Sequence, residues 1–273
     1  MSRLKERMAA LRGAERKALI PFITAGDPTP DFTLAAIRSL VRSGADIIEI
    51  GVPFSDPMAD GPVIQRASER ALSHGMSLRK TLDLVRTYRE EDPETPIVLM
   101  GYLNPIEALG YERFCELASD AGIDGVLTVD MPPEESDSFL TLLESARIDP
   151  IFLLAPNSIP SRIRKMGNLG RGYLYYVALK GVTGAGHLDL ADVERKLSEI
   201  RNLTDLPIAV GFGVKNAETA SAIARLADGV VIGSALVALI EASKDQPDEA
   251  LRAIEALMGS IRAALDHVQI TRA

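Results

Sequence analysis

The 273-residue sequence has little of what several common kinds of site require. Cys115 is the only cysteine, so neither a disulfide framework nor a cysteine-based metal site is expected. The three histidines, His74, His187 and His267, are scattered, which argues against a zinc or iron cluster. No apolar run approaches the length that spans a bilayer. The sequence therefore predicts a protein without a disulfide scaffold, a cysteine–histidine metal centre or a membrane span.

The sequence also has fewer basic residues than acidic ones. The chain has 30 Lys and Arg against 38 Asp and Glu, and its formal net charge is −8. Nucleic acids and anionic membranes would repel such a protein, so neither is expected as a partner. The first residues, MSRLKERMAALRG, are charged throughout and lack the apolar core of a signal peptide. Together with the single cysteine, this predicts a cytoplasmic protein.

Short apolar runs recur along the chain, and they are continuous rather than alternating. That pattern is typical of strands buried on both faces of a parallel sheet. The eight runs are Ala18–Thr24, Asp46–Ile50, Pro96–Met100, Gly125–Val129, Pro150–Leu154, Tyr173–Ala178, Pro207–Val210 and Asp228–Ile232. Segments with helical spacing separate most of them, for example Thr33–Ser43, Leu78–Tyr88, Tyr111–Asp120 and Ala217–Leu226. The longer gap between the second and third runs leaves room for an insertion after Glu49.

Eight strand–helix units favour a closed (β/α)₈ TIM barrel. The alternative is an open doubly wound sheet, which usually carries GxGxxG in its first strand–helix turn. Here that turn reads TAGDPTP, residues 24–30. Met1–Ala14 predicts an extra N-terminal helix, and Pro247–Val268 predicts a final one. Since no linker or low-complexity tract interrupts the pattern, we expect residues 1–273 to form a single TIM-barrel domain.

Two carboxylates stand where such barrels carry out their chemistry, on the loops that follow the carboxyl ends of the strands. They are Glu49 and Asp60 in the stretch IIEIGVPFSDPMAD. Burial should raise the pKa of Glu49, as a proton shuttle near neutral pH requires, whereas Asp60 in a wetter loop should stay ionised and accept a hydrogen bond. The simpler alternatives are a buried ion pair for Glu49 and ordinary Asp-Gly turn chemistry for Asp60.

Glycine-rich turns follow the last three predicted strands. Their sequences are GVTGAG at residues 181–186, VGFGV at residues 210–214 and IGSA at residues 232–235. Turns after the seventh and eighth strands of a barrel, together with the N-terminus of a helix, commonly bind phosphate through backbone amides. The alternative is that the glycines only permit tight turns. We expect a phosphate-binding site at these two turns.

Several motifs in order along the chain resemble the alpha subunit of tryptophan synthase. They are PFITAGDP, EIGVPFSDPMADGPVIQ, LMGYLNPI, DMPPEES, GVTGA, VGFGV and IGSALV, and the resemblance runs from about Leu11 to Gly259. It implies a carbon–carbon lyase of L-tryptophan biosynthesis, which performs the retro-aldol cleavage of indole-3-glycerol phosphate to indole and glyceraldehyde 3-phosphate. It also implies that this chain needs no cofactor.

The resemblance implies roles for individual residues. Glu49 would protonate the indole C3 and remove the proton of the adjacent hydroxyl, and Asp60 would pair with the ring N–H. Tyr175 would lie close to Glu49, and Thr183 would belong to a loop that closes near Asp60. The implied apolar indole slot is formed by Phe22, Met100, Leu127 and Val129. The implied phosphate site is formed by Gly184, Gly213, Gly233 and Ser234, with Phe212 beside them.

The resemblance further implies a partner, a pyridoxal-phosphate-dependent tryptophan synthase beta subunit in an α₂β₂ hetero-tetramer. The contacts would come from the loops Pro53–Pro57 and Leu103–Pro105. Two other classes stay open: a stand-alone lyase that releases free indole, and a non-catalytic phosphate-binding subunit that only activates a partner. Intact Glu49 and Asp60 argue against the non-catalytic subunit, and the two loops argue against the stand-alone lyase.

Overall fold

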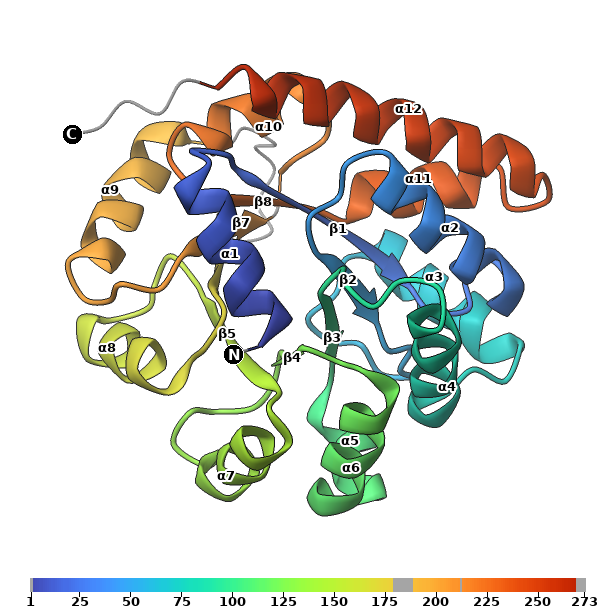
Figure 1. Ribbon diagram of the computed structural model, residues 1–273, viewed down its shortest axis with the longest axis horizontal. Coiled ribbons are helices and arrows are strands. Elements are labelled where there is room, and N and C mark those ends of the chain that lie inside the picture. The colour runs from blue at the N-terminus through green and yellow to red at the C-terminus, as the bar shows by residue number, and fades with distance from the viewer. Residues whose placement is uncertain (1, 179–188, 212, 269–273) are drawn as a thin grey trace.

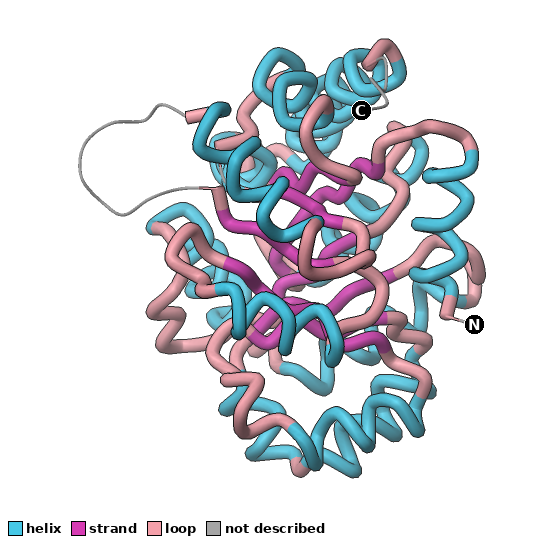
Figure 2. The backbone as a smooth tube through the Cα atoms, turned by 90° about the vertical axis from the view of Figure 1, so that its left-hand side faces the viewer, coloured by secondary structure: helices cyan, strands magenta, loops and turns pink. Residues whose placement is uncertain are grey.

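Eight parallel strands close into a barrel in chain order, which confirms the predicted TIM barrel (Figures 1 and 2). The computed structural model describes residues 2–178, 189–211 and 213–268. The strands are β1 (Ala18–Thr24), β2 (Ile48–Gly51), β3 (Ile97–Gly101), β4 (Gly125–Thr128), β5 (Asp149–Leu154), β6 (Leu174–Val177), β7 (Ile208–Gly211) and β8 (Gly229–Ile232). Each strand lies within one or two residues of its predicted apolar run.

Helices surround the strands (Figure 2). They are α1 (Arg3–Gly13), α2 (Pro30–Arg42), α3 (Pro62–Ser73), α4 (Leu78–Arg89), α5 (Leu103–Leu109), α6 (Tyr111–Ala121), α7 (Asp137–Ala146), α8 (Pro160–Leu169), α9 (Leu190–Arg201), α10 (Ala217–Ala224), α11 (Ser234–Ala242) and α12 (Pro247–Asp266). The N-terminal and final helices are confirmed as α1 and α12. The predicted insertion after Glu49 contains a loop and two helices, α3 and α4.

The strand side chains divide between two apolar cores. Ile48 and Ile50 pack outward against the helices. Ile47 packs inward with Leu4 of α1, which lies across the amino-terminal end of the barrel (Figure 1). Successive residues of a strand face opposite sides of the sheet. Because Ile48 and Ile50 both face the helices, Glu49 between them points into the barrel interior.

Aspartates at the amino-terminal ends of strands hold neighbouring strands together. In three places an aspartate just before a strand accepts the backbone N–H of the preceding strand through Oδ2. These bonds join Asp46 to Leu19 at 2.9 Å, Asp124 to Ile97 at 2.8 Å and Asp228 to Ile208 at 2.9 Å. Asp124 also pairs with Arg3 at 2.8 Å and with Arg89 at 2.7 Å. Charged groups at this end of the barrel therefore fix strand register.

One sequence prediction about local structure was wrong. Leu103–Pro105 was expected to be a loop, but these residues form the first turn of α5. A proline is tolerated in the first turn of a helix because its missing N–H would have no intrahelical partner there. The exposed N–H of Leu103 instead bonds to Asp130 Oδ1 at 2.8 Å, so a side chain from the neighbouring strand–helix loop satisfies this helix terminus.

We predict that Asp124→Ala lowers the free energy of unfolding by about 3–5 kcal/mol, because it leaves the buried Ile97 N–H without its acceptor and the Arg89 guanidinium without its carboxylate partner. The matched control is Arg113→Ala, which breaks an ion pair whose side chains are 54% and 63% exposed. The control substitution should change the free energy of unfolding by no more than about 0.5 kcal/mol. Chemical denaturation measures the free energy of unfolding of both variants. Equal effects of the two substitutions would contradict the structural role of Asp124.

Candidate active site

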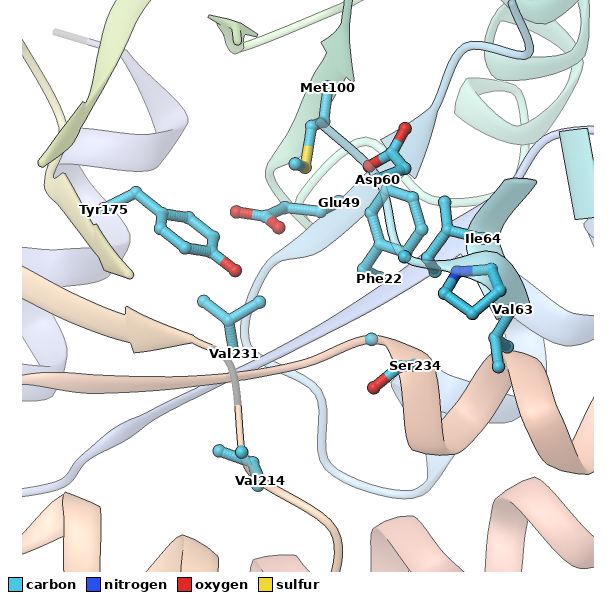
Figure 3. A pocket seen from close by; sticks show the side chains of 14 residues that line it. Phe22, Glu49, Asp60, Val63, Ile64, Met100, Tyr175, Val214, Val231 and Ser234 are labelled. Carbon is cyan, nitrogen blue, oxygen red and sulfur yellow. The ribbon is translucent and has the colours of Figure 1, made fainter. Parts of the chain in front are cut away.

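A cavity of about 330 Å³ opens at the carboxyl ends of the strands. Glu49 and Asp60, the two carboxylates singled out in the sequence, line it together with apolar side chains and the glycine turns that follow the last two strands (Figure 3). The lining residues are Phe22, Glu49, Asp60, Gly61, Pro62, Val63, Ile64, Met100, Tyr175, Gly213, Val214, Val231, Gly233 and Ser234. The fold thus brings residues as far apart in the sequence as Phe22 and Ser234 together around one cavity.

Glu49 lines the cavity and is fully buried, with 0% of its surface exposed. Its Oε1 accepts a hydrogen bond from the Tyr173 hydroxyl at 2.5 Å. Its Oε2 is buried and has no hydrogen-bond partner among the described residues. Figure 3 shows the carboxylate pointing toward the Tyr175 ring. One oxygen is therefore fixed by the protein, and the other is available to a bound molecule.

Burial raises the pKa of Glu49 from its ordinary 4.5 to about 7, and the Tyr173 hydrogen bond opposes this shift. Within the described part of the chain, no Lys or Arg forms an ion pair with Glu49, so the buried-ion-pair alternative is not supported. A carboxyl group with this pKa exists in both protonation states near neutral pH. It can therefore donate a proton in one step and accept a proton in another.

Asp60 lies in the loop between β2 and α3, and its side chain is half-buried. Its Oδ2 accepts a hydrogen bond from the Tyr102 hydroxyl at 3.0 Å, and the same hydroxyl accepts the Ala59 N–H at 3.0 Å. Burial is the main cause of a raised pKa for the Asp60 carboxyl, and the Tyr102 hydrogen bond opposes it. The Asp60 carboxyl is thus less open to water than the sequence predicted. Tyr102, supported by a ring contact with Phe54 at 5.2 Å, holds this loop against the barrel.

The four residues of the predicted apolar slot occupy different positions. Phe22 and Met100 line the cavity beside Asp60 (Figure 3). Leu127 is buried in the core inside the barrel and does not line the cavity. Val129 lines a smaller adjoining cavity, which Phe22 and Met100 also border. The apolar walls of the main cavity instead include Val63, Ile64, Val214 and Val231, which the sequence prediction did not name.

Tyr175 lines the cavity, as predicted, and is 4% exposed. The negative charge of Glu49 contributes to raising the pKa of the Tyr175 hydroxyl, after the larger effect of burial, so the two groups lie close together. A Cβ at Gly211 of β7 would lie only 1.9 Å from the Tyr175 hydroxyl oxygen. Gly211 is therefore required to make room for this ring.

The predicted phosphate turns lie at one side of the same cavity. Gly213, Gly233 and Ser234 all line it. Gly213 has φ +87°, a conformation that side chains other than glycine rarely adopt. Gly233 is the N-cap of α11, and no side chain caps this helix. Its free N–H groups and positive dipole end favour an anion at this point.

Three predicted residues, Thr183, Gly184 and Phe212, lie outside the described residues. Sequence reasoning missed Tyr173, although it stands two residues before Tyr175 in a predicted strand and so shares its inward face. It also gave Tyr102 no role, because the sequence does not show that this side chain contacts the loop that contains Asp60.

Across residues 2–178, 189–211 and 213–268, no group of three or more His, Cys, Asp or Glu residues could hold a metal ion. None of the helices in this part of the chain combines the length and apolarity that crossing a membrane requires.

Comparisons with known proteins identify the family of this chain. A family model described as tryptophan synthase alpha chain matches residues 8–266. The chain is 65% identical to the tryptophan synthase alpha chain of Methylococcus capsulatus and 57% identical to that of Laribacter hongkongensis; each match covers 97% of this chain and 100% of the relative.

The crystal structure of tryptophan synthase subunit alpha from Legionella pneumophila str. Paris is similar to this chain, with a TM-score of 0.92 and 42% identity. The match covers 98% of this chain and 100% of the Legionella chain. Sequence and structure agree over nearly the full length, and the resemblance found in the motifs is confirmed: the chain belongs to the tryptophan synthase alpha chain family.

Proposed function

We propose that Glu49 and Asp60 carry the chemistry of this chain, which as a tryptophan synthase alpha chain is a lyase that cleaves indole-3-glycerol phosphate in tryptophan biosynthesis. The observation that carries this proposal is the buried Glu49 carboxyl, which has a pKa of about 7 and one oxygen without a protein partner in a cavity. The products are indole and glyceraldehyde 3-phosphate.

Cleaving the bond between the indole C3 and the glycerol chain requires two proton transfers. C3 must gain a proton, and the hydroxyl on the adjacent carbon must lose one, so that the hydroxyl carbon becomes the aldehyde as the bond breaks. Glu49 in its acid form supplies the first proton, and as a carboxylate it accepts the second. Because Tyr173 holds only Oε1, the free Oε2 is the oxygen that exchanges protons with the substrate.

Protonation at C3 places positive charge on the indole ring. Asp60 lies beside Phe22 and Met100, whose apolar surfaces suit an indole ring (Figure 3). Its carboxylate accepts the ring N–H and stabilises that charge, while Tyr102 fixes the carboxylate position. Asp60 thus assists a step in which Glu49 transfers the proton.

The phosphate of the substrate binds at the N-terminus of α11. Gly213 and Gly233 let backbone amides approach the anion, and the Ser234 hydroxyl adds a donor. The proposed chemistry uses only protein carboxylates, hydroxyls and amides, so this chain needs no cofactor of its own.

The partner proposed for this chain is a tryptophan synthase beta subunit that carries pyridoxal phosphate, in a cytoplasmic α₂β₂ complex. Three large apolar side chains are exposed within the described residues, Met58, Ile159 and Leu190, with 86%, 61% and 39% of their surfaces accessible. They follow β2, β5 and β6, so all three lie on the same end of the barrel as the cavity. We propose that the beta subunit docks at this end of the barrel, with Pro53–Pro57 and Leu103–Pro105 as contacts.

We predict that Glu49→Gln lowers the rate of cleavage by at least about 10²–10⁴, since it keeps the shape and removes the proton-transferring group. Substrate should still bind. Single-turnover indole release measures the rate, and Glu116→Gln, at an exposed position of α6, is the matched control. A Glu49→Gln variant that keeps more than about a tenth of the wild-type rate would rule out the shuttle.

Gly213→Val should raise KM far more than it lowers kcat, because a branched side chain at φ +87° strains the turn and fills the approach to the anion. Binding of inorganic phosphate should weaken, and binding of free indole should change little. Calorimetry measures both ligands. Gly259→Ala is the control, since a Cβ there meets nothing within 4 Å. Unchanged phosphate binding in Gly213→Val would place the phosphate elsewhere.

Purified beta subunit, titrated into this chain, should bind saturably and accelerate indole formation. Asp56→Ala, at an exposed position of the Pro53–Pro57 loop, should weaken binding and leave the cleavage rate of the isolated chain unchanged. Asp245→Ala changes an equally exposed aspartate in the α11–α12 connection and should have no effect on binding. No association at micromolar concentration, together with fast cleavage by the isolated chain, would favour a stand-alone lyase.

A further inference from the structure

A second, much smaller cavity adjoins the main one behind Asp60. Its volume is about 20 Å³, and Phe22, Asp60, Ile64 and Met100 border both cavities. Four of its lining residues carry side-chain oxygens: Thr24, Asp60, Ser68 and Tyr102. The mechanism proposed above uses Asp60 and Tyr102 and gives no role to Thr24 or Ser68.

Thr24 is the unexplained residue of this cavity. It is the last residue of β1 and is 2% exposed. Its Oγ1 is buried and has no hydrogen-bond partner among the described residues. A buried hydroxyl without a partner is unfavourable, and such groups in proteins are usually satisfied by a bound water. Ser68 of α3 is 4% exposed and supplies a second hydroxyl-bearing side chain to the same cavity.

The size and polarity of the cavity fit one water molecule. A buried water needs roughly 10–15 Å³ of accessible volume and two to four polar partners. The cavity provides about 20 Å³ and four oxygen-bearing side chains. A cavity of this size that is lined only by apolar groups would stay dry. This cavity is lined by a carboxylate and by a hydroxyl that has no partner among the described residues, so it suits a water.

We propose that this cavity binds a single water that links the Thr24 hydroxyl to the Asp60 carboxylate, and that Thr24 is a positioning residue for Asp60. The Thr24 hydroxyl donates to the water, and the water donates to Asp60. Tyr102 already donates to Asp60 Oδ2 at 3.0 Å, so the water adds a second, independent restraint on the carboxylate. The inference rests on the proposed role of Asp60 in cleavage.

The test uses Thr24→Val, which keeps the shape of the side chain and removes its hydroxyl. The value of kcat for indole-3-glycerol phosphate cleavage should fall by about tenfold, the size expected for one lost hydrogen bond to a charged group, with little change in KM. Thr24→Ser should restore most of the rate. Thr81→Val is the matched control: Thr81 is also fully buried, but its hydroxyl bonds to Ser77 O within α4. That variant should cleave like the wild type.

A double-mutant cycle separates positioning from a general structural effect. In an Asp60→Asn background, Thr24→Val should change kcat by less than about twofold, because the group it positions is gone. The same tenfold loss in both backgrounds would show that Thr24 acts independently of Asp60 and would overturn the inference. So would a crystal structure without an ordered water within hydrogen-bond distance of Thr24 Oγ1.

The outcomes also distinguish this inference from the proposed function. If Asp60→Asn cleaves measurably but far more slowly than the wild type, and Thr24→Val cleaves like the wild type, the water link is wrong and the role of Asp60 stands. If Asp60→Asn itself cleaves like the wild type, the proposed function of Asp60 fails, and the inference about Thr24 fails with it.

Discussion

A carboxyl group inside the barrel, without a positive partner among the described residues, is the constraint on which the rest of this structure depends. Glu49 is fully buried, receives one hydrogen bond from Tyr173 and is otherwise surrounded by the interior core. Removing a carboxylate from water destabilises the charged form, so the pKa rises until the group can exchange protons near neutral pH. The burial that would suit Glu49 to the proposed proton transfers is therefore unfavourable for folding, as is common in active sites.

The barrel separates this unfavourable group from the interactions that stabilise the fold. At the amino-terminal end, aspartates accept backbone N–H groups across adjacent strands and pair with arginines, as Asp46 does with Arg262 at 3.0 Å. Leu4 of α1 closes the same end with apolar contacts. At the carboxyl end, by contrast, Glu49 and Thr24 line cavities, and each has a buried oxygen with no hydrogen-bond partner in the described part of the chain. Because the two ends share the strands but not the side chains, the site can hold unsatisfied groups without loosening the strand register.

Much of the fold followed from local sequence patterns, since continuous apolar runs and helical spacing mark buried strands and covering helices whatever their neighbours are. The two carboxylates proposed for catalysis could also be identified in the sequence, because Glu49 interrupts an apolar strand and Asp60 lies in the loop that follows. Contacts between segments that are distant in the sequence could not be predicted from it. Nothing local to Tyr102 shows that it donates to Asp60, and nothing local to Thr24 shows that its hydroxyl lacks a partner. Leu127 is apolar and follows the expected pattern, yet its place in the interior core depends on the register of the whole barrel.

Burial sets the protonation of Glu49, and no positive charge among the described residues compensates for it. The most direct test measures the free energy of unfolding of the wild type and of Glu49→Gln from pH 4 to pH 9. A group whose pKa rises on folding from 4.5 to about 7 contributes stability that is present below the lower value and is lost as the pH rises through the upper one. Glutamine does not titrate, so the variant should match the wild type most closely near pH 4 and gain relative stability up to pH 7, reaching an advantage of about 3 kcal/mol that stays constant above it. A difference between the two proteins that does not change with pH would contradict the account.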